Sequence, residues 1–437
     1  MLHLAVPAFL ALIAEPLFLL ADTAIVGHLG TAQLAGLGLA STVLLTVVGS
    51  FVFLAYGTTA AAARQVGAGS RRGALEVGVD GTWLALGLGL LAAAAVALTA
   101  DPVCRALGGD GPGHDAAVTY LRIAAIGIPP MLVTLACTGV LRGLQDTRTP
   151  LVAAVAGFSA NAVLNLLFVY GFRWGIAGSA IGTVIAQTGM AAWLVWALIR
   201  QVRAEGAGTR AHPGRILATG RDGIPLLVRT IALRAVLVLT TWLAAGMGVV
   251  PLAAHQVTAT IWSFLAFALD AVAIAAQALT GRALGAGDAQ EARTLTGLMV
   301  RWGVWSGAVV GLVVLAVHRL LPVLFTGDPQ VRGAVAAGLV VVAVSQALCG
   351  FVFVVDGVLI GAGDARWLAR SMVVVSLAYL PVVAAVRAWA PAAPAPAVTS
   401  LWLGFTSFMA IRASLLWWRV RGDAWLVLGA ERPGAGA

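Results

Sequence analysis

The sequence has little charge and no lysine. Asp, Glu, Lys and Arg make up 10% of the 437 residues, against roughly 25% in an average soluble domain, and all 27 basic residues are arginine. Apolar residues make up 60% of the chain, more than one globular core could bury. The composition therefore excludes an ordinary soluble domain and a disordered or collagen-like chain, and it is typical of a polytopic membrane protein.

Cysteine is also scarce. Cys104, Cys137 and Cys349 have neither CxxC nor metal-ligand spacing, and no Ser/His/Asp arrangement stands out. We therefore expect no disulfide framework, no metal site and no cofactor. The first apolar stretch runs from Met1 to about Gly27 without a basic start or a cleavage site, so it is expected to be a first membrane span and not a signal peptide.

Apolar runs separated by Gly, Pro, Arg and Asp predict an all-α protein with twelve transmembrane helices. The expected spans are 4–27, 34–62, 76–99, 116–140, 150–171, 174–199, 222–247, 252–280, 294–317, 331–358, 366–389 and 396–418. The predicted organisation is an N-terminal six-helix lobe (1–200), a cytoplasmic linker (201–221), a C-terminal six-helix lobe (222–420) and a cytoplasmic tail (421–437).

The arginines are distributed unequally between the two sides of the membrane. Eighteen lie in one set of alternate loops and the C-terminal tail, five lie in the other set, and four fall inside predicted spans. The positive-inside rule then places both termini in the cytoplasm, with the protein in the inner membrane. The net charge of +9 is explained by topology, so the expected partner is membrane lipid and not nucleic acid.

The chain repeats itself at an offset of 218 residues. The segments that begin at Gly30, Arg64 and Gly139 match those that begin at Gly248, Arg282 and Gly357. Six spans per half is an even number, so both halves enter the membrane the same way up. Two like-oriented bundles of this kind are typical of transporters.

Acidic residues inside spans are informative, because a charge in hydrocarbon costs about 3 kcal/mol on insertion scales. Glu15 and Asp22 share one face of the first span, and Pro16 can bend that helix. Burial favours the protonated form of a carboxyl group, so such a group can bind and release a proton near neutral pH. We favour this role for Asp22, whereas the sequence leaves both a functional and a structural role open for Glu15.

Other polar residues within spans have two possible roles. Asn161 and Asn165 lie one helical turn apart, where they could join helices or line a polar cavity, and the sequence leaves both open. In the second half, Arg234 and Asp270 are expected to form an ion pair. Asp356 occupies the repeat position of Thr138, and Thr240 that of Asp22, so the two lobes differ chemically.

The first span carries the residues of a known family. Glu15-Pro-Leu-Phe-Leu-Leu-Ala-Asp-Thr-Ala-Ile-Val-Gly-His-Leu-Gly30 resembles the opening helix of the multidrug and toxic compound extrusion (MATE) family, in particular its DinF-type branch. Further similar stretches are Leu141–Pro150, Asn161–Asn165, Gly175–Ala180 and Ala253–Val257. The resemblance covers the whole chain.

This resemblance implies two six-helix bundles in a V and antiport of small organic, often cationic, compounds against protons or sodium. The essential aspartate of the first lobe maps onto Asp22. Positions of the substrate cavity map onto Tyr120, Thr138, Asn161, Asn165 and Thr183. The chain departs from related members in having Asn165 where they carry a second acid and Thr138 where they carry Asn, so Asp22 would act with neutral partners.

The resemblance also bears on the coupling ion. The sodium-type site of the second lobe uses one acid on the seventh helix and another on the tenth. Asp356 matches the second acid, but the seventh helix has Arg229 and Arg234 instead of an acid. We therefore expect proton coupling, with Asp356 as a less favoured coupling residue, in a monomeric transporter.

Two alternatives remain at this level. A lipid-linked sugar flippase of the same superfamily would need a strongly cationic cavity, to which Arg229 and Arg234 could contribute. A membrane-embedded enzyme or a non-transporting scaffold is disfavoured, because the sequence shows no metal or nucleophile constellation.

Overall fold

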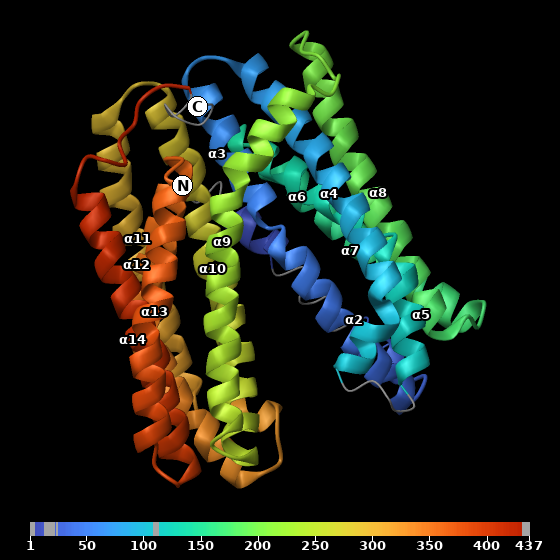
Figure 1. The fold of residues 1–437 in the computed structure, drawn as a ribbon, viewed down its shortest axis with the longest axis vertical. Helices are drawn as coiled ribbons and strands as arrows, with labels where there is room; N and C mark the ends of the chain where they lie inside the picture. Colours follow the sequence, from blue (N-terminus) through green and yellow to red (C-terminus); the bar gives the residue numbers. More distant parts are fainter. Residues whose placement is uncertain (1–4, 13–21, 23–24, 108–112, 431–437) are drawn as a thin grey trace. The chain divides into compact units, whose positions relative to one another are not determined.

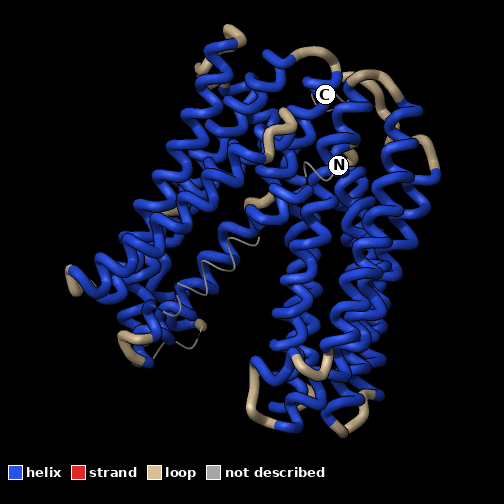
Figure 2. The backbone as a smooth tube through the Cα atoms, turned by 180° about the vertical axis from the view of Figure 1, so that it is seen from behind, coloured by secondary structure: helices blue, strands red, loops and turns tan. Residues whose placement is uncertain are grey.

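The computed structural model describes residues 5–12, 22, 25–107 and 113–430, and throughout these ranges the regular structure is helical (Figures 1 and 2). The helices of the first half are α2 (Thr31–Ser50), α3 (Phe53–Gly67), α4 (Arg71–Ala106), α5 (His114–Ala125), α6 (Ile128–Gly143), α7 (Arg148–Leu166) and α8 (Gly175–Ala204). Those that follow are α9 (Pro213–Ala245), α10 (Val249–Gly285), α11 (Ala289–Val317), α12 (Pro329–Gly361), α13 (Ala365–Trp389) and α14 (Pro394–Arg421). A π-helical turn, Leu167–Gly171, extends α7, and a short 3₁₀ turn, Leu321–Leu324, precedes α12.

The described residues contain ten helices that are long and apolar enough to cross a membrane, counting α2 and α3 as one span. The helices α5 and α6 add an eleventh, bent by 49° between Ala125 and Ile128. Half of the expected first span lies outside the described residues, and so do Glu15 and Pro16. The proposed bend at Pro16 therefore stays a prediction.

Turn geometry confirms the internal repeat. Backbone φ is positive at equivalent positions of the two halves, which are Gly30 and Gly248 (130° and 114°), Gly69 and Gly287 (79° and 78°), and Gln145 and Gly363 (65° and 68°). Glycine adopts this conformation without steric cost, which explains its frequency at these helix ends. N-caps repeat as well: Ser70 accepts a hydrogen bond from the backbone N–H of Gly73, and Asp288 accepts one from Glu291.

The chain divides into two compact units, one comprising the chain up to Leu227 and the other Val228–Gly429. In the second unit α12 is the central helix and packs against α10, α11 and α14. Gly303, Gly307 and Gly311 of α11 lie directly against α12; a Cβ at Gly307 would be 2.2 Å from the carbonyl oxygen of Gln346. Small residues at helix contacts allow this close packing in membranes.

The connection between the two halves is more helical than the sequence suggests. Residues 201–204 continue α8 and residues 213–221 begin α9, so only 205–212 of the expected linker lie outside helices. The division between the compact units falls within α9, between Leu227 and Val228, six residues beyond the end of that linker. Proline at position 213 suits the start of α9, because the first helical N–H has no partner within the helix.

Candidate functional site

The side chain of Asp22 is buried in the first unit, with 3% of its surface exposed, and is surrounded by neutral hydrogen-bond donors. Asn165 Nδ2 and Ser179 Oγ each donate to Asp22 Oδ1 over 2.7 Å. The Tyr120 hydroxyl donates to the other oxygen, Oδ2, over a longer distance of 3.4 Å. All three donors are buried. A carboxylate removed from water needs such donors, since burial without them is costly.

Three helices supply the donors. Tyr120 lies on α5, Ser179 lies on α8, and Asn165 lies near the end of α7, just before the π-helical turn. Turns of this type are frequent at functional sites, because they change the direction in which helical side chains point. Tyr120 and Asn165, which the resemblance places in the substrate cavity, thus both contact Asp22.

Asn161 and Thr183 form a second polar contact between α7 and α8. Asn161 Nδ2 donates to Thr183 Oγ1 over 3.0 Å, and both residues are buried. Asn161 lines a small cavity whose other walls are Gly157, Phe158, Ala186, Gln187 and Met190. The oxygen Oδ1 of Asn161 has no hydrogen-bond partner among the described residues, so it is available to a donor that enters the cavity.

Thr138 is the remaining cavity residue expected from the sequence. It lies on α6 and is half-buried, but it is not among the described residues that donate to Asp22. The structure therefore brings Tyr120 and Asn165 to Asp22 and pairs Asn161 with Thr183. Thr138 lies outside these contacts.

Among the described residues, the groups that hydrogen-bond to Asp22 are neutral donors. None of the ion pairs found in the described part of the chain includes Asp22. Protonation of this group would therefore change the net charge of the site from −1 to zero.

Buried charges of the second unit gather around Asp356. Asp356 on α12 forms ion pairs with Arg229 on α9 and Arg412 on α14, and all three are buried. Arg412 Nη2 lies 2.5 Å from Asp356 Oδ2, the oxygen that also contacts Arg229. The expected pair of Arg234 with Asp270 stays a prediction; both side chains are half-buried. Arg412 on α14 provides a second cation at Asp356, beside Arg229.

At the repeat position of Asp22, the second unit has a neutral contact. Thr240 on α9 lies 3.2 Å from the hydroxyl of Tyr379 on α13, oxygen to oxygen, and both are buried. Tyr379 is the repeat equivalent of Asn161. This contact agrees with the prediction that the two lobes differ chemically.

Sequence reasoning missed three residues that the structure brings forward. Ser179 lies within the family-like stretch Gly175–Ala180, but nothing in the pattern points to Asp22. Arg412 is an arginine inside a predicted span, which could have identified it as a partner of a buried acid. Asp80 is an acid near the start of a predicted span, with a side chain only 4% exposed.

Comparison with known proteins agrees with this geometry. The family model described as MatE matches residues 7–167 and 225–384. The chain is 34% identical to Protein DETOXIFICATION 44, chloroplastic, of Arabidopsis thaliana, over 99% of this chain and 84% of that protein. It is 28% identical to DNA damage-inducible protein F of Escherichia coli (strain K12), over 94% of this chain and 89% of that protein.

Solved structures share the fold. A multidrug resistance transporter in an outward-facing conformation superposes with a TM-score of 0.87 at 21% identity, over 97% of this chain and 95% of that one. The crystal structure of a MATE protein in the straight conformation gives a TM-score of 0.86 at 20% identity, with 96% and 95% covered. The prediction of an all-α membrane protein with this fold is confirmed.

Proposed function

The chain belongs to the multidrug and toxic compound extrusion (MATE) family, and from that premise we propose that it exports small organic, often cationic, compounds in exchange for protons. The family consists of secondary transporters and not enzymes, so this multi-pass membrane protein is an efflux transporter. The coupling ion, the substrate class and the roles of individual residues are the content of the proposal.

One observation carries the proposal: Asp22 is a buried carboxyl group whose hydrogen-bond partners among the described residues are neutral donors. A carboxyl group in this setting has no fixed cation to keep it ionised. A proton or a cationic substrate can each neutralise it, and binding of one disfavours binding of the other. Competition of this kind is what an antiporter requires.

The transport cycle follows from this competition. With Asp22 deprotonated, the first lobe accepts a cationic compound. The cavity beside Asn161 measures about 10 Å³ in this structure, so it must widen before the apolar part of the compound can enter. A proton that reaches Asp22 from outside removes the negative charge, and the substrate leaves. Thr183 and Tyr120 contribute polar contacts at either end of this path, and Thr138 is proposed as a more distant part of the cavity wall.

Protons are favoured over sodium because of the second lobe. Asp356, the carboxylate that matches the sodium-type site, already contacts Arg229 and Arg412. Two guanidinium groups beside one carboxylate oppose the binding of a further cation through Coulomb repulsion. The same pairing reduces the free positive charge that a flippase would need for a pyrophosphate.

The proposal includes location and assembly. The arginine asymmetry supports an inner-membrane protein with both termini in the cytoplasm, acting as a monomer in contact with lipid and without a nucleic-acid partner. The chain would need no metal or organic cofactor.

The test is transport in proteoliposomes under an imposed proton gradient without sodium. The efflux of a fluorescent organic cation measures this transport. Wild-type protein should transport, and Asp22→Asn should lose transport while it inserts and folds normally. Asp115→Asn is the matched control, because Asp115 is an exposed carboxylate on α5, the helix of Tyr120. This variant should retain wild-type transport.

Three other outcomes would replace the proposal. Full transport by Asp22→Asn would remove Asp22 from the mechanism. Transport that starts only when sodium is added would indicate sodium coupling. If neither gradient drives transport, and the protein binds an anionic lipid in a way that Arg234→Ala abolishes, the flippase would be supported.

A further inference from the structure

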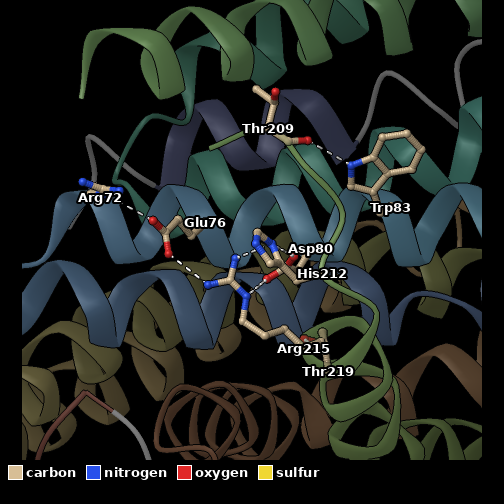
Figure 3. A network of polar contacts seen from close by, with 8 residues as sticks. All are labelled: Arg72, Glu76, Asp80, Trp83, Thr209, His212, Arg215 and Thr219. Atoms are coloured by element: carbon tan, nitrogen blue, oxygen red, sulfur yellow. Dashed lines mark hydrogen bonds and ion pairs between the residues drawn. The ribbon is translucent and has the colours of Figure 1, made fainter. Parts of the chain in front are cut away.

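The segment between the two halves is attached to α4 by polar contacts along the cytoplasmic side predicted from the arginines (Figure 3). Arg71, at the start of α4, contacts Gln201 over 3.0 Å and Glu205 over 3.1 Å. Three turns further along α4, the indole N–H of Trp83 donates to the backbone carbonyl of Thr209 over 3.3 Å. The segment thus follows α4 from Arg71 to Trp83 and then turns back, since Arg215 contacts Glu76 and Asp80.

Arg215, in the first turn of α9, is the centre of this network. Its Nη1 lies 3.0 Å from Glu76 Oε2 and its Nε lies 2.8 Å from Asp80 Oδ2. His212 Nδ1 lies 3.1 Å from Arg215 Nη2, and Arg72 forms a separate ion pair with Glu76. Figure 3 shows the guanidinium group of Arg215 between the two carboxylates.

The geometry suits arginine in particular. Glu76 and Asp80 lie one turn apart on α4, so one planar guanidinium group can bond to both. The side chain of Asp80 is only 4% exposed, whereas that of Arg215 is 46% exposed. Arg215 therefore compensates a nearly buried carboxylate, and loss of this partner would leave Asp80 with only the more distant His212, whose Nδ1 lies 3.9 Å from Asp80 Oδ1.

Beyond Arg215, α9 continues to pack against the first unit. A Cβ at Gly220 would lie 3.5 Å from Leu84 Cδ1 on α4, and one at Gly223 would lie 2.6 Å from the ring of Phe53 on α3. The division between the compact units follows at Leu227 and Val228. Pro225 lies inside α9 just before this point. Proline removes one backbone hydrogen bond from a helix, and sharp helix bends concentrate at such positions.

We propose that residues 213–224 form a rigid arm of the first lobe, fixed to α4 by Arg215, and that movement between the lobes during transport is taken up in α9 at Pro225. Alternating access in transporters of two bundles is largely a rocking of one bundle against the other. A single helix that passes from one compact unit to the other must absorb that movement at some point. The hinge is thus assigned to Pro225 and not to the linker. This proposal rests on the proposed function as a transporter of the family, and it does not depend on which ion is coupled.

A disulfide between the arm and α4 tests the first half of the proposal. The double variant Leu84→Cys/Gly220→Cys should form this bond under mild oxidation, because the two positions are in contact. The native cysteines are buried, so they should not compete for the new thiols. Loss of free thiols measures the bond, and transport is measured before and after reduction. Cross-linked protein should transport as well as reduced protein, because the arm does not leave α4. Loss of transport on cross-linking, with recovery on reduction, would overturn the proposal.

Removal of Arg215 gives the converse test. Arg215→Ala should lower transport by at least about fivefold, because it removes the ion pairs to Glu76 and Asp80 and frees the arm. The same substitution in the Leu84→Cys/Gly220→Cys protein should regain transport when the disulfide forms. A variant that merely failed to fold would not be rescued by oxidation, so absence of rescue in a correctly folded, cross-linked protein would also refute the role of Arg215.

Pro225→Ala tests the hinge itself. Alanine restores the missing N–H and stiffens the helix, so transport should slow by about fivefold while the protein becomes no less stable. Pro381→Ala is the matched control, since Pro381 lies inside α13, is exposed, and is far in sequence from the division between the units. Equal transport by Pro225→Ala and wild type would overturn the assignment. If the proton proposal failed, these comparisons would still be made under whichever gradient drives transport.

Discussion

Gly182 of α8 lies directly against the side-chain oxygen of Asn165: a Cβ built at Gly182 would be 2.3 Å from Asn165 Oδ1. The opposite end of the same amide group donates to Asp22. Because Gly182 has no side chain, the Asn165 amide can occupy the space beside it. From this position the amide makes one of the two shortest hydrogen bonds to the Asp22 carboxylate. A methyl group added at Gly182 should therefore disturb the hydrogen bond from Asn165 to Asp22, although no polar residue is changed.

The variant Gly182→Ala tests this relationship. The added methyl group must displace the Asn165 amide, which lengthens or breaks its bond to Asp22, so proton-driven efflux should fall by about tenfold, in line with loss of a hydrogen bond to a charged group. Gly189→Ala is the control on the same helix, because nothing lies within 4 Å of a Cβ at Gly189. Equal transport by the two variants would contradict the argument.

The three donors to Asp22 should not be equally important. Ser179→Ala removes a donor at 2.7 Å and should reduce transport by about tenfold, whereas Tyr120→Phe removes one at 3.4 Å and should reduce it by less than about threefold, since long hydrogen bonds are weak. Initial efflux rates at equal protein density give the comparison. The reverse order would show that Tyr120 has a role beyond this hydrogen bond, for example direct contact with substrate.

The fold was predictable because two strong signals agree. Long apolar segments predict helices wherever lipid is the solvent, and the 218-residue offset predicts two equivalent lobes. The positive φ angles at Gly69 and Gly287 show why the repeated glycines could be aligned from sequence: each marks the end of a helix. The start of α9 was missed because residues 213–221 contain a Pro-Gly pair, a further glycine and two arginines, which are typical of a loop, and because contacts with α4 that no local pattern shows stabilise this helix.

The candidate site was only partly predictable. Asp22 and the pair Asn161/Asn165 stood out because polar groups inside spans must find partners. Which partner each one finds depends on helix packing, and sequence spacing within one helix does not specify it. For this reason Ser179 was missed as a partner of Asp22, and Arg412 was missed as a partner of Asp356.

The repeated turns allow a stability prediction. Gly287 has a φ of 78° and open space around its Cβ position, so Gly287→Ala should destabilise the protein by about 1 kcal/mol through backbone strain alone. Gly297, within α11, has equally open space but no positive φ, and Gly297→Ala should be neutral or stabilise the helix by up to about 1 kcal/mol. Thermal unfolding of the purified proteins in one detergent gives both values. A loss of stability in both variants would indicate a packing effect.

The cluster of Arg229, Asp356 and Arg412 joins three helices of the second unit, and its substitution separates stability from transport. Asp356→Ala leaves two buried arginines without this carboxylate and should cost about 3–5 kcal/mol, visible as a large decrease in the unfolding temperature. The triple variant Arg229→Met/Asp356→Leu/Arg412→Met removes all three charges, and apolar replacements of whole buried ion pairs are often neutral. It should therefore regain stability. Because the proposed proton exchange takes place at Asp22, the triple variant should also keep proton-driven efflux. A stable triple variant without transport would show that the second lobe takes part in coupling, and that Asp22 does not act alone.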